Sequence, residues 1–254
     1  MILAYLALLG ANLVYATSYV ATRVTLGSVP PATLALARLV IGSLVLAPLA
    51  RPRVSDPTLS HDDRRAIAWM GILGFAAAYV FGHWGIARST ATNAALLIVV
   101  EPIALMLLSP LYLGERLSRR EALGAALAVA GSVLVVLNGI PGVTGTLVSH
   151  WQGDLLLVLA GLAYASYSLL GRRVLERHAP LGVTARSLVW GAAGILPVAG
   201  VEWASGARAA WTATAVAGTL LGAALLGEPL TPFTILGGAL IVAGLAVAFG
   251  PGAR

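Results

Sequence analysis

The sequence predicts an all-α, polytopic membrane protein, a bundle of about nine helices that each cross a bilayer. Hydrophobic residues make up 59% of the chain and charged residues only 10%, whereas soluble domains carry about 25% charged residues. The apolar residues fall in runs of the length that a membrane-spanning helix needs, about 20 residues. Short breaks rich in proline and glycine separate these runs, for example GSVPP at 27–31 and GEPLTP at 227–232. The excess apolar surface is therefore expected to face lipid.

Nine apolar runs can be counted along the chain. They cover about 2–22, 32–50, 66–87, 91–113, 121–138, 153–171, 183–201, 209–226 and 231–249. The first run has no positively charged segment before it and no small-residue cleavage site, so we expect it to be a first span and not a removable signal peptide. The longest polar stretch is 51–65, which leaves no room for a soluble domain.

The arginines predict how the bundle is oriented, because cytoplasmic loops carry an excess of basic residues. If the N-terminus is cytoplasmic, ten arginines fall in inside loops and only three in outside connections. The ten are Arg51, Arg53, Arg64, Arg65, Arg116, Arg119, Arg120, Arg172, Arg173 and Arg177. We expect a multi-pass protein of the cell (inner) membrane with a cytoplasmic N-terminus. Since the arginines mark the ends of apolar runs and do not cluster, no nucleic-acid partner is expected.

Two segments of the chain repeat each other without a gap. LGERLSRREALGAALAVAG at 113–131 matches LGEPLTPFTILGGALIVAG at 226–244 at an offset of 113 residues. Earlier in the two halves the offset is larger, because Tyr15 matches Tyr164 at an offset of 149 residues. The second copy has therefore lost about 35 residues relative to the first.

The repeat divides the chain into two units, residues 1–140 with five spans and residues 151–250 with about four apolar segments. A copy that follows five spans enters the membrane upside down. Inverted repeats of this kind occur in many secondary transporters, with the substrate site at the repeat interface near the bilayer midplane.

The doubled motif resembles the EamA-like family of the drug/metabolite transporter superfamily. The family pattern is an apolar run with a proline, then GE-x-[LI]-[ST], then a glycine-bounded helix, and it is met at 101–131 and more briefly at 225–244. The resemblance implies a ten-helix bundle that moves small metabolites, amino acids or drugs across the membrane, often with an ion gradient. The chain departs from it at 211–227, which resembles a fusion of the eighth and ninth helices and leaves the orientation of the last helix open.

Glu101 and Pro102 lie in the middle of the run LLIVVEPIALMLL at 96–108. An ionisable residue near the bilayer centre indicates a functional site facing a cavity. A carboxyl group shielded from water holds its proton more tightly, so Glu101 is a candidate for proton coupling or for binding a cationic substrate. The alternative is a structural, hydrogen-bonded acid beside a proline kink. Its position in the second repeat falls on Thr214, so Glu101 has no symmetry mate.

Polar and aromatic side chains share helix faces elsewhere and are further candidates for a central cavity. Tyr79 and His83 are one turn apart on the third span, and histidine could relay protons to Glu101. The two other faces consist of Asn12, Tyr15 and Tyr19 on the first span and of Tyr164 and Tyr167 on the sixth. The alternatives are an interfacial aromatic belt or interhelical hydrogen bonds.

Arg38 and Arg186 lie a turn or two inside their spans in matching positions, and we expect both to extend to the membrane interface. No HExxH, G-x-S-x-G or Walker motif is present, and the scattered histidines indicate no metal site, so neither an enzyme nor a cofactor is expected. The expected partners are the lipid bilayer and a small-molecule substrate. Two rival hypotheses remain, a family member that no longer transports because of its shortened second repeat, and an intramembrane enzyme.

Overall fold

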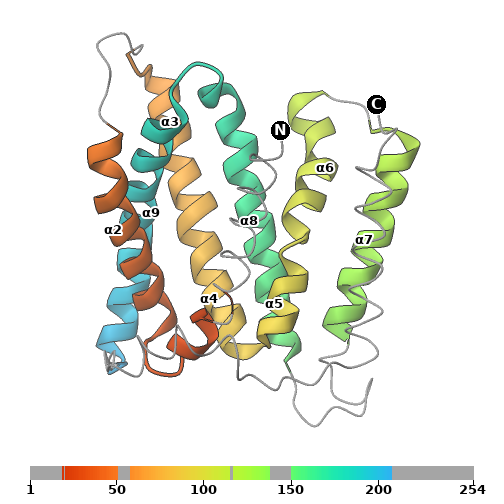
Figure 1. Cartoon of the computed structure of the whole chain (residues 1–254), viewed down its shortest axis with the longest axis horizontal. Coiled ribbons are helices and arrows are strands. Elements are labelled where there is room, and N and C mark those ends of the chain that lie inside the picture. The colour runs from red at the N-terminus through yellow and green to blue at the C-terminus, as the bar shows by residue number, and fades with distance from the viewer. Residues whose placement is uncertain (1–18, 20, 51–57, 115–116, 138–149, 208–254) are drawn as a thin grey trace, which may run out of the picture.

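The computed structural model describes residue 19 and residues 21–50, 58–114, 117–137 and 150–207. Within these ranges every regular element is a helix, and the helices stand side by side in alternating directions (Figure 1). Six helices are long and apolar enough to cross a membrane: Pro31–Pro48, His61–Arg88, Ala91–Tyr112, Arg119–Leu137, Trp151–Leu175 and Pro180–Ala204. They confirm the predicted spans from the second to the seventh. The predicted spans at 2–22, 209–226 and 231–249 lie outside the described residues, apart from a few at the end of the first.

One long helix passes through the middle of the described bundle. It consists of α3 (His61–Trp69), a π-helical segment η1 (Met70–Ala77) and α4 (Ala78–Arg88). Ser60 caps its start, because its side-chain oxygen accepts a hydrogen bond from the backbone N–H of Asp63 at 3.1 Å. The wider turns of η1 come directly before the residues of α4 that face the pocket described below.

The predicted span 91–113 is divided into α5 (Ala91–Leu97) and α6 (Val100–Leu113). Pro102 is the reason, because it has no N–H to donate to the carbonyl of Ile98. That carbonyl instead accepts a hydrogen bond from the N–H of Glu101 at 3.1 Å. The break thus satisfies the carbonyl that proline would otherwise leave unpaired.

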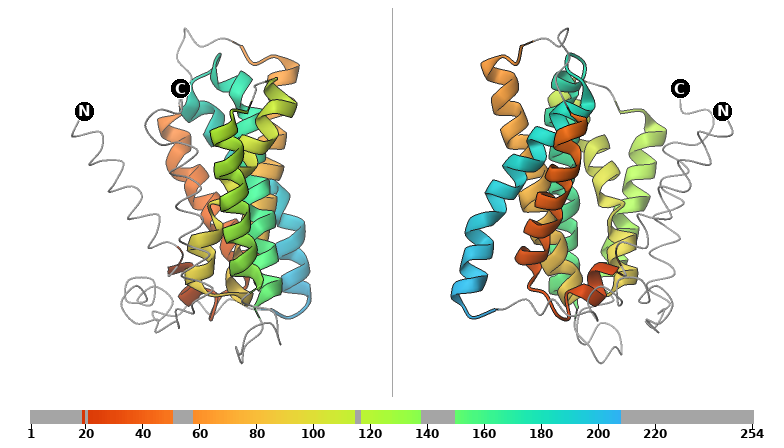
Figure 2. Two further views of the ribbon diagram at one scale, coloured as in Figure 1. Left: turned by 90° about the vertical axis from the view of Figure 1, so that its right-hand side faces the viewer. Right: turned by 60° about the vertical axis from the view of Figure 1, so that its left-hand side comes forward.

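The remaining helices are α2 (Pro31–Leu49), α7 (Arg119–Leu137), α8 (Trp151–Leu175) and α9 (Pro180–Ala204). The central helix packs against α8 on one side and against α9 and α2 on the other. Helices α8 and α9 meet at their short connection and then diverge, so that they contact each other little (Figure 2). Helices α5, α6 and α7 follow beyond α8 (Figure 1).

Glycines allow the central helix to approach its neighbours closely. A Cβ atom added at Gly71 would lie 2.6 Å from the Cβ of Trp190, and one added at Gly74 would lie 2.5 Å from the Cβ of Tyr167. A similar close contact joins α8 to α6, where a Cβ added at Gly161 would lie 2.9 Å from the Cβ of Val100. Such distances permit only a hydrogen atom in place of a side chain, which is how helices associate in lipid.

Large apolar side chains are exposed on the outward faces of the described helices. Ile41 and Leu44 of α2 are 61% and 69% exposed, and Val189 and Val201 of α9 are 57% and 70% exposed. In water this much exposed apolar surface would cause aggregation, but against lipid chains it is favourable. The exposed surface therefore agrees with the composition in defining a multi-pass membrane protein.

The contact at Gly71 predicts the effect of a single added methyl group. We expect Gly71→Ala to lower the stability of the detergent-purified protein by about 1–3 kcal/mol, because the new Cβ overlaps Trp190 and the backbone of α9. Gly200→Ala is the matched control, since a Cβ there meets nothing within 4 Å. Thermal unfolding of both variants measures the difference, and equal melting temperatures would show that the close packing does not stabilise the fold.

Candidate functional site

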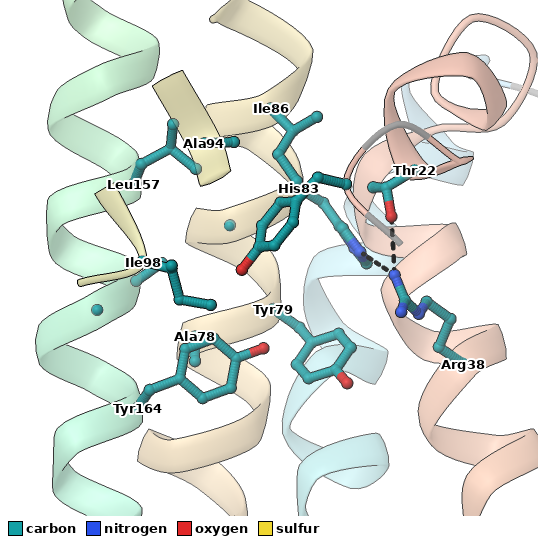
Figure 3. Close-up of a pocket in the computed structure, with 14 residues that line it drawn as sticks. Thr22, Arg38, Ala78, Tyr79, His83, Ile86, Ala94, Ile98, Leu157 and Tyr164 are labelled. Carbon is teal, nitrogen blue, oxygen red and sulfur yellow. Dashed lines mark hydrogen bonds between the residues drawn. The ribbon is translucent and has the colours of Figure 1, made fainter. Parts of the chain in front are cut away.

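A pocket opens between the helices near the middle of the described bundle (Figure 3). Its empty space is about 580 Å³, including the part open to the surroundings. Helices α2 and α4 supply one part of its wall and α8 the part opposite, with α5 and the α5–α6 break between them. Four of the residues predicted from the sequence line it, namely Tyr19, Tyr79, His83 and Tyr164.

A group of polar side chains forms one side of the pocket. The Nη1 atom of Arg38 donates a hydrogen bond to Oγ1 of Thr22 at 2.9 Å and lies 3.4 Å from Nε2 of His83. Arginine cannot accept a hydrogen bond, so Nε2 of His83 is the acceptor and this histidine is neutral. Thr22 and His83 are buried, with 4% and 3% of their surface exposed. Figure 3 shows the Arg38 side chain directed from α2 toward these two residues.

Aromatic rings form the rest of the wall. The rings of Tyr79 and His83 meet edge to face with their centroids 5.5 Å apart, and those of Tyr79 and Tyr164 meet at 6.0 Å. The guanidinium carbon of Arg38 lies 5.6 Å from the centre of the Tyr79 ring, a distance suited to a cation–π interaction. Aromatic faces beside a few polar groups are typical of sites that bind small organic molecules.

The other candidate residues lie elsewhere or outside the described ranges. Glu101 and Pro102 are half-buried in the first turn of α6 and do not line the pocket. Tyr167 packs between η1 and α9, with its hydroxyl 3.0 Å from Oγ1 of Thr184, so it makes the interhelical hydrogen bond given above as the alternative. Asn12 and Tyr15 are outside the described residues.

The structure corrects the expectation for Arg38. Its guanidinium lies in the pocket wall, where Nη1 donates a hydrogen bond to Oγ1 of Thr22. Arg186, its counterpart in the second repeat, is exposed, and its Nη1 donates to the carbonyl of Gly182 in its own helix at 3.5 Å. The difference between the two lies in their surroundings, because Thr22 and His83 contact the guanidinium of Arg38.

Sequence reasoning also missed the acidic residues that connect the helix ends. The carboxylate of Glu202 near the end of α9 accepts hydrogen bonds from the backbone N–H groups of Ala32 and Thr33, at 3.0 and 3.1 Å. It also accepts a hydrogen bond from Nε1 of Trp84 at 3.2 Å. Glu202 thereby caps the start of α2 and ties α2, α4 and α9 together, an arrangement favoured by the positive end of the helix dipole.

A second acid is buried at the same end of the bundle, at the start of α8. Asp154 has no exposed surface and accepts hydrogen bonds from Oγ of Ser89 and, at 3.1 Å, from Nδ2 of Asn93. Nδ1 of His150 lies 2.7 Å from the other carboxylate oxygen. These bonds join α8 to the connection between α4 and α5, and they satisfy a carboxylate that would otherwise be costly to bury.

A third acid holds the opposite end of the bundle. Asp63, in the first turn of α3, forms an ion pair at 2.8 Å with Nη2 of Arg177 and lies 3.2 Å from Nε2 of His178. Both partners come from the connection between α8 and α9. The two ends of the described bundle are therefore closed by polar contacts, and the pocket lies between them. In the part of the chain that the structure describes, no cluster of residues suited to a metal ion occurs.

A helical membrane protein with a polar, aromatic pocket between its helices is the class that this fold and site define. Residues 2–137 match the model of the EamA-like transporter family, and the chain belongs to that family. This confirms the resemblance found in the sequence motifs.

Proteins similar to this chain include an exporter, an uncharacterised transporter and an uncharacterised protein. The chain is 30% identical to a probable terminal-alkyne amino-acid exporter of Streptantibioticus cattleyicolor. The match covers 72% of this chain and 60% of the length of that exporter. It is 32% identical to an uncharacterised protein of Pseudomonas aeruginosa, and this match covers 81% of the chain and 82% of that protein. It spans 41% of the length of the uncharacterised transporter YyaM of Bacillus subtilis, at 30% identity. One solved crystal structure aligns with this chain with a TM-score of 0.59 and 24% sequence identity. The alignment covers 93% of this chain and 92% of the chain in that structure, and it supports the fold alone.

The contacts of Glu202 predict a loss of stability when its charge is removed. We expect Glu202→Gln to destabilise the protein by about 1–3 kcal/mol, because hydrogen bonds to a charged acceptor are the stronger ones and an amide cannot accept at both ends. Glu176→Gln, at an exposed position in the connection between α8 and α9, is the control. Thermal unfolding in detergent is the measurement, and a melting temperature equal to that of the control would contradict the capping role.

Proposed function

We propose that this protein moves small organic molecules across the cell (inner) membrane by alternating access, with the pocket as its substrate site. The observation that carries the proposal is the polar and aromatic pocket inside a lipid-facing bundle of an EamA-like family member. Its wall combines α2, α4 and α5 of the first predicted repeat with α8 of the second. A site made from both repeats is what an inverted-repeat transporter requires.

The proposal includes the architecture predicted from the sequence. The two repeats, residues 1–140 and 151–250, form about nine spans with the N-terminus in the cytoplasm. Under this orientation the Asp63–Arg177 contact lies at the cytoplasmic end and the Glu202 and Asp154 contacts lie at the outer end. Alternating access would then break and remake one set of contacts at a time.

Small metabolites, amino acids and drugs are the proposed range of substrates. The pocket wall combines polar and aromatic side chains, which is typical of sites for small organic molecules, and one relative is named as an amino-acid exporter. The apolar residues among the lining, such as Ile86, Ile98 and Leu157, would contact the carbon skeleton of a substrate.

Glu101 is the proposed coupling residue. Its carboxylate is half-buried beside the α5–α6 break, and its backbone nitrogen would lie 3.2 Å from a Cβ at Gly161, a residue of the pocket wall. A change in the pocket could thus reach Glu101 through the contact between α6 and α8. The acid would bind a proton from one side of the membrane and release it to the other.

Flux into proteoliposomes tests the function and the role of Glu101. We expect wild-type protein to accumulate radiolabelled amino acids or related metabolites when a pH gradient is imposed. Glu101→Gln cannot exchange a proton, so its gradient-driven uptake should fall to the rate seen without a gradient, while exchange of substrate against substrate continues. Glu176→Gln is expected to behave as wild type.

Unchanged gradient-driven uptake in Glu101→Gln would remove Glu101 from the mechanism. Absence of flux for every substrate would favour the second candidate function, a family member that does not transport. The observation that supports this candidate is the loss of about 35 residues from the second repeat in the sequence. An intramembrane enzyme has less support, because the sequence carries none of the motifs sought.

A further inference from the structure

Two adjacent residues of α4 contact different parts of the bundle. His83 lines the pocket, whereas Nε1 of Trp84 donates a hydrogen bond to the carboxylate of Glu202 in α9 at 3.2 Å. Successive residues of a helix point about 100° apart around its axis, which is why one turn of α4 faces both the pocket and α9. A shift of this turn therefore acts on the pocket wall and on the contact with α9 together.

Glu202 is joined to α2 by more hydrogen bonds than to α4. Its carboxylate accepts from the backbone N–H groups of Ala32 and Thr33, at 3.0 and 3.1 Å, and from the hydroxyl of Thr33 at 3.3 Å. The next residue of α9, Trp203, donates from Nε1 to the same hydroxyl oxygen at 2.9 Å. Among the described residues α4 contributes one donor, the Nε1 of Trp84. The end of α9 is thus bound mainly to the start of α2.

Apolar packing joins the same two helix ends. Ala199 of α9 is buried in one cluster with Ala32 and Ala35 of α2. Helices α2 and α9 lie side by side at one edge of the described bundle (Figure 1). The start of α2 and the end of α9, residues 31–35 and 198–204, therefore form one unit, called the α2–α9 unit below.

Pro197 lies between this unit and the part of α9 that packs closely against η1. A Cβ added at Gly191 would lie 2.8 Å from the Cβ of Phe75, and one added at Gly194 would lie 2.9 Å from the Cβ of Ala76. Proline has no N–H to donate within a helix, and helices bend at such positions. A hinge at Pro197 would let the α2–α9 unit move while the earlier part of α9 stays against η1.

Movement of the α2–α9 unit away from α4 would part the wall of the pocket. Thr22, in the segment just before α2, and Ile86 of α4 both line the pocket. Arg23 of the same segment donates a hydrogen bond to the carbonyl of Ile86. This bond and the one between Trp84 and Glu202 both hold the closed arrangement, and both are released when the unit moves.

We propose that the hydrogen bond between Trp84 and Glu202 is the latch of a gate at the outer end of the pocket. When the latch is released, the α2–α9 unit swings from α4 about Pro197, and substrate enters or leaves on that side. This rests on the pocket being the substrate site and on the orientation of the bundle, as proposed above. A substrate that contacts His83 touches the turn of α4 that carries Trp84, so occupation of the pocket shifts the balance between the closed and open arrangements.

A thiol reporter can test the gate, because the chain has no cysteine. Ala94→Cys places a thiol at a lining position that is 1% exposed. A charged methanethiosulfonate reagent that does not cross the bilayer, added to right-side-out membrane vesicles, reaches this thiol only when the pocket opens to the outside. We expect Trp84→Phe in this background to be modified about tenfold faster, because it keeps an aromatic ring but loses a hydrogen bond to a charged acceptor. Mass spectrometry of the protein measures the rate.

Trp203→Phe is the matched control. It loses the same indole N–H at the same end of the bundle, but its partner Thr33 lies inside the α2–α9 unit. The reporter in this variant should react at the unaltered rate. An equal rate in all three proteins, an increase in Trp203→Phe as large as in Trp84→Phe, or an increase seen only in inside-out vesicles would overturn the proposal.

Two further variants test the hinge and guard against a folding defect. Pro197→Ala restores the missing N–H of α9 and should slow the modification of the Trp84→Phe protein, whereas an unchanged rate would remove the hinge from the proposal. If Trp84→Phe does not fold, as judged by size-exclusion chromatography, Arg23→Leu takes its place. This variant releases the other contact with α4 and should also raise the rate, and an unchanged rate would overturn the gate.

The reporter separates this proposal from the transport function, because its modification requires opening of the pocket but no flux. Faster modification of Trp84→Phe, without flux of any substrate in proteoliposomes, would refute transport and leave the gate established. Flux in proteoliposomes together with equal reporter rates in all variants would support transport and overturn the gate.

Discussion

The central helix can occupy the middle of the bundle only because glycines bring its backbone against α8 and α9. In lipid no hydrophobic effect drives helices together, so close contact supplies the attraction. Gly71 and Gly74 of η1 leave no space for a side chain opposite Trp190 and Tyr167. The pocket depends on the same contacts, since they fix α4 between α2 and α8 and so set the distance from Arg38 to Tyr164.

The charged groups of the described bundle occupy two kinds of place, the ends of the helices and the pocket wall. Asp63, Asp154 and Glu202 lie near the helix ends and are satisfied by backbone N–H groups, neutral side chains or an arginine. Each joins elements far apart in the sequence. Arg38 lies away from these ends, in the pocket wall, where its Nη1 contacts Thr22 and His83. The ends are thus closed by polar contacts, and the pocket lies between them.

Much of the fold follows from the sequence, but the site follows only in part. Run length and proline positions predicted six of the described spans, and spacing one turn apart brought Tyr79 and His83 together on one face. Glu101, which its place in an apolar run assigns to a cavity, lies on α6 outside the described pocket lining, and its role stays a prediction. Arg38 and Glu202 could not be assigned from local pattern, since their roles depend on Thr22, His83, Ala32 and Trp84, which tertiary packing brings to them.

The π-helical segment η1 sets the rotational phase of everything that follows it in the central helix. Each residue added to or removed from a helix turns the later side chains by about 100° around its axis. The wide turns at Met70–Ala77 therefore let the glycines face α8 and α9 while Tyr79 and His83, only a few residues on, face Arg38. Tightening this segment into α-helix by a single-residue deletion would turn the aromatic wall away from the cation without altering any residue of either. A slight unwinding of one helix, rather than the movement of a whole domain, is thus enough to assemble the pocket or to take it apart.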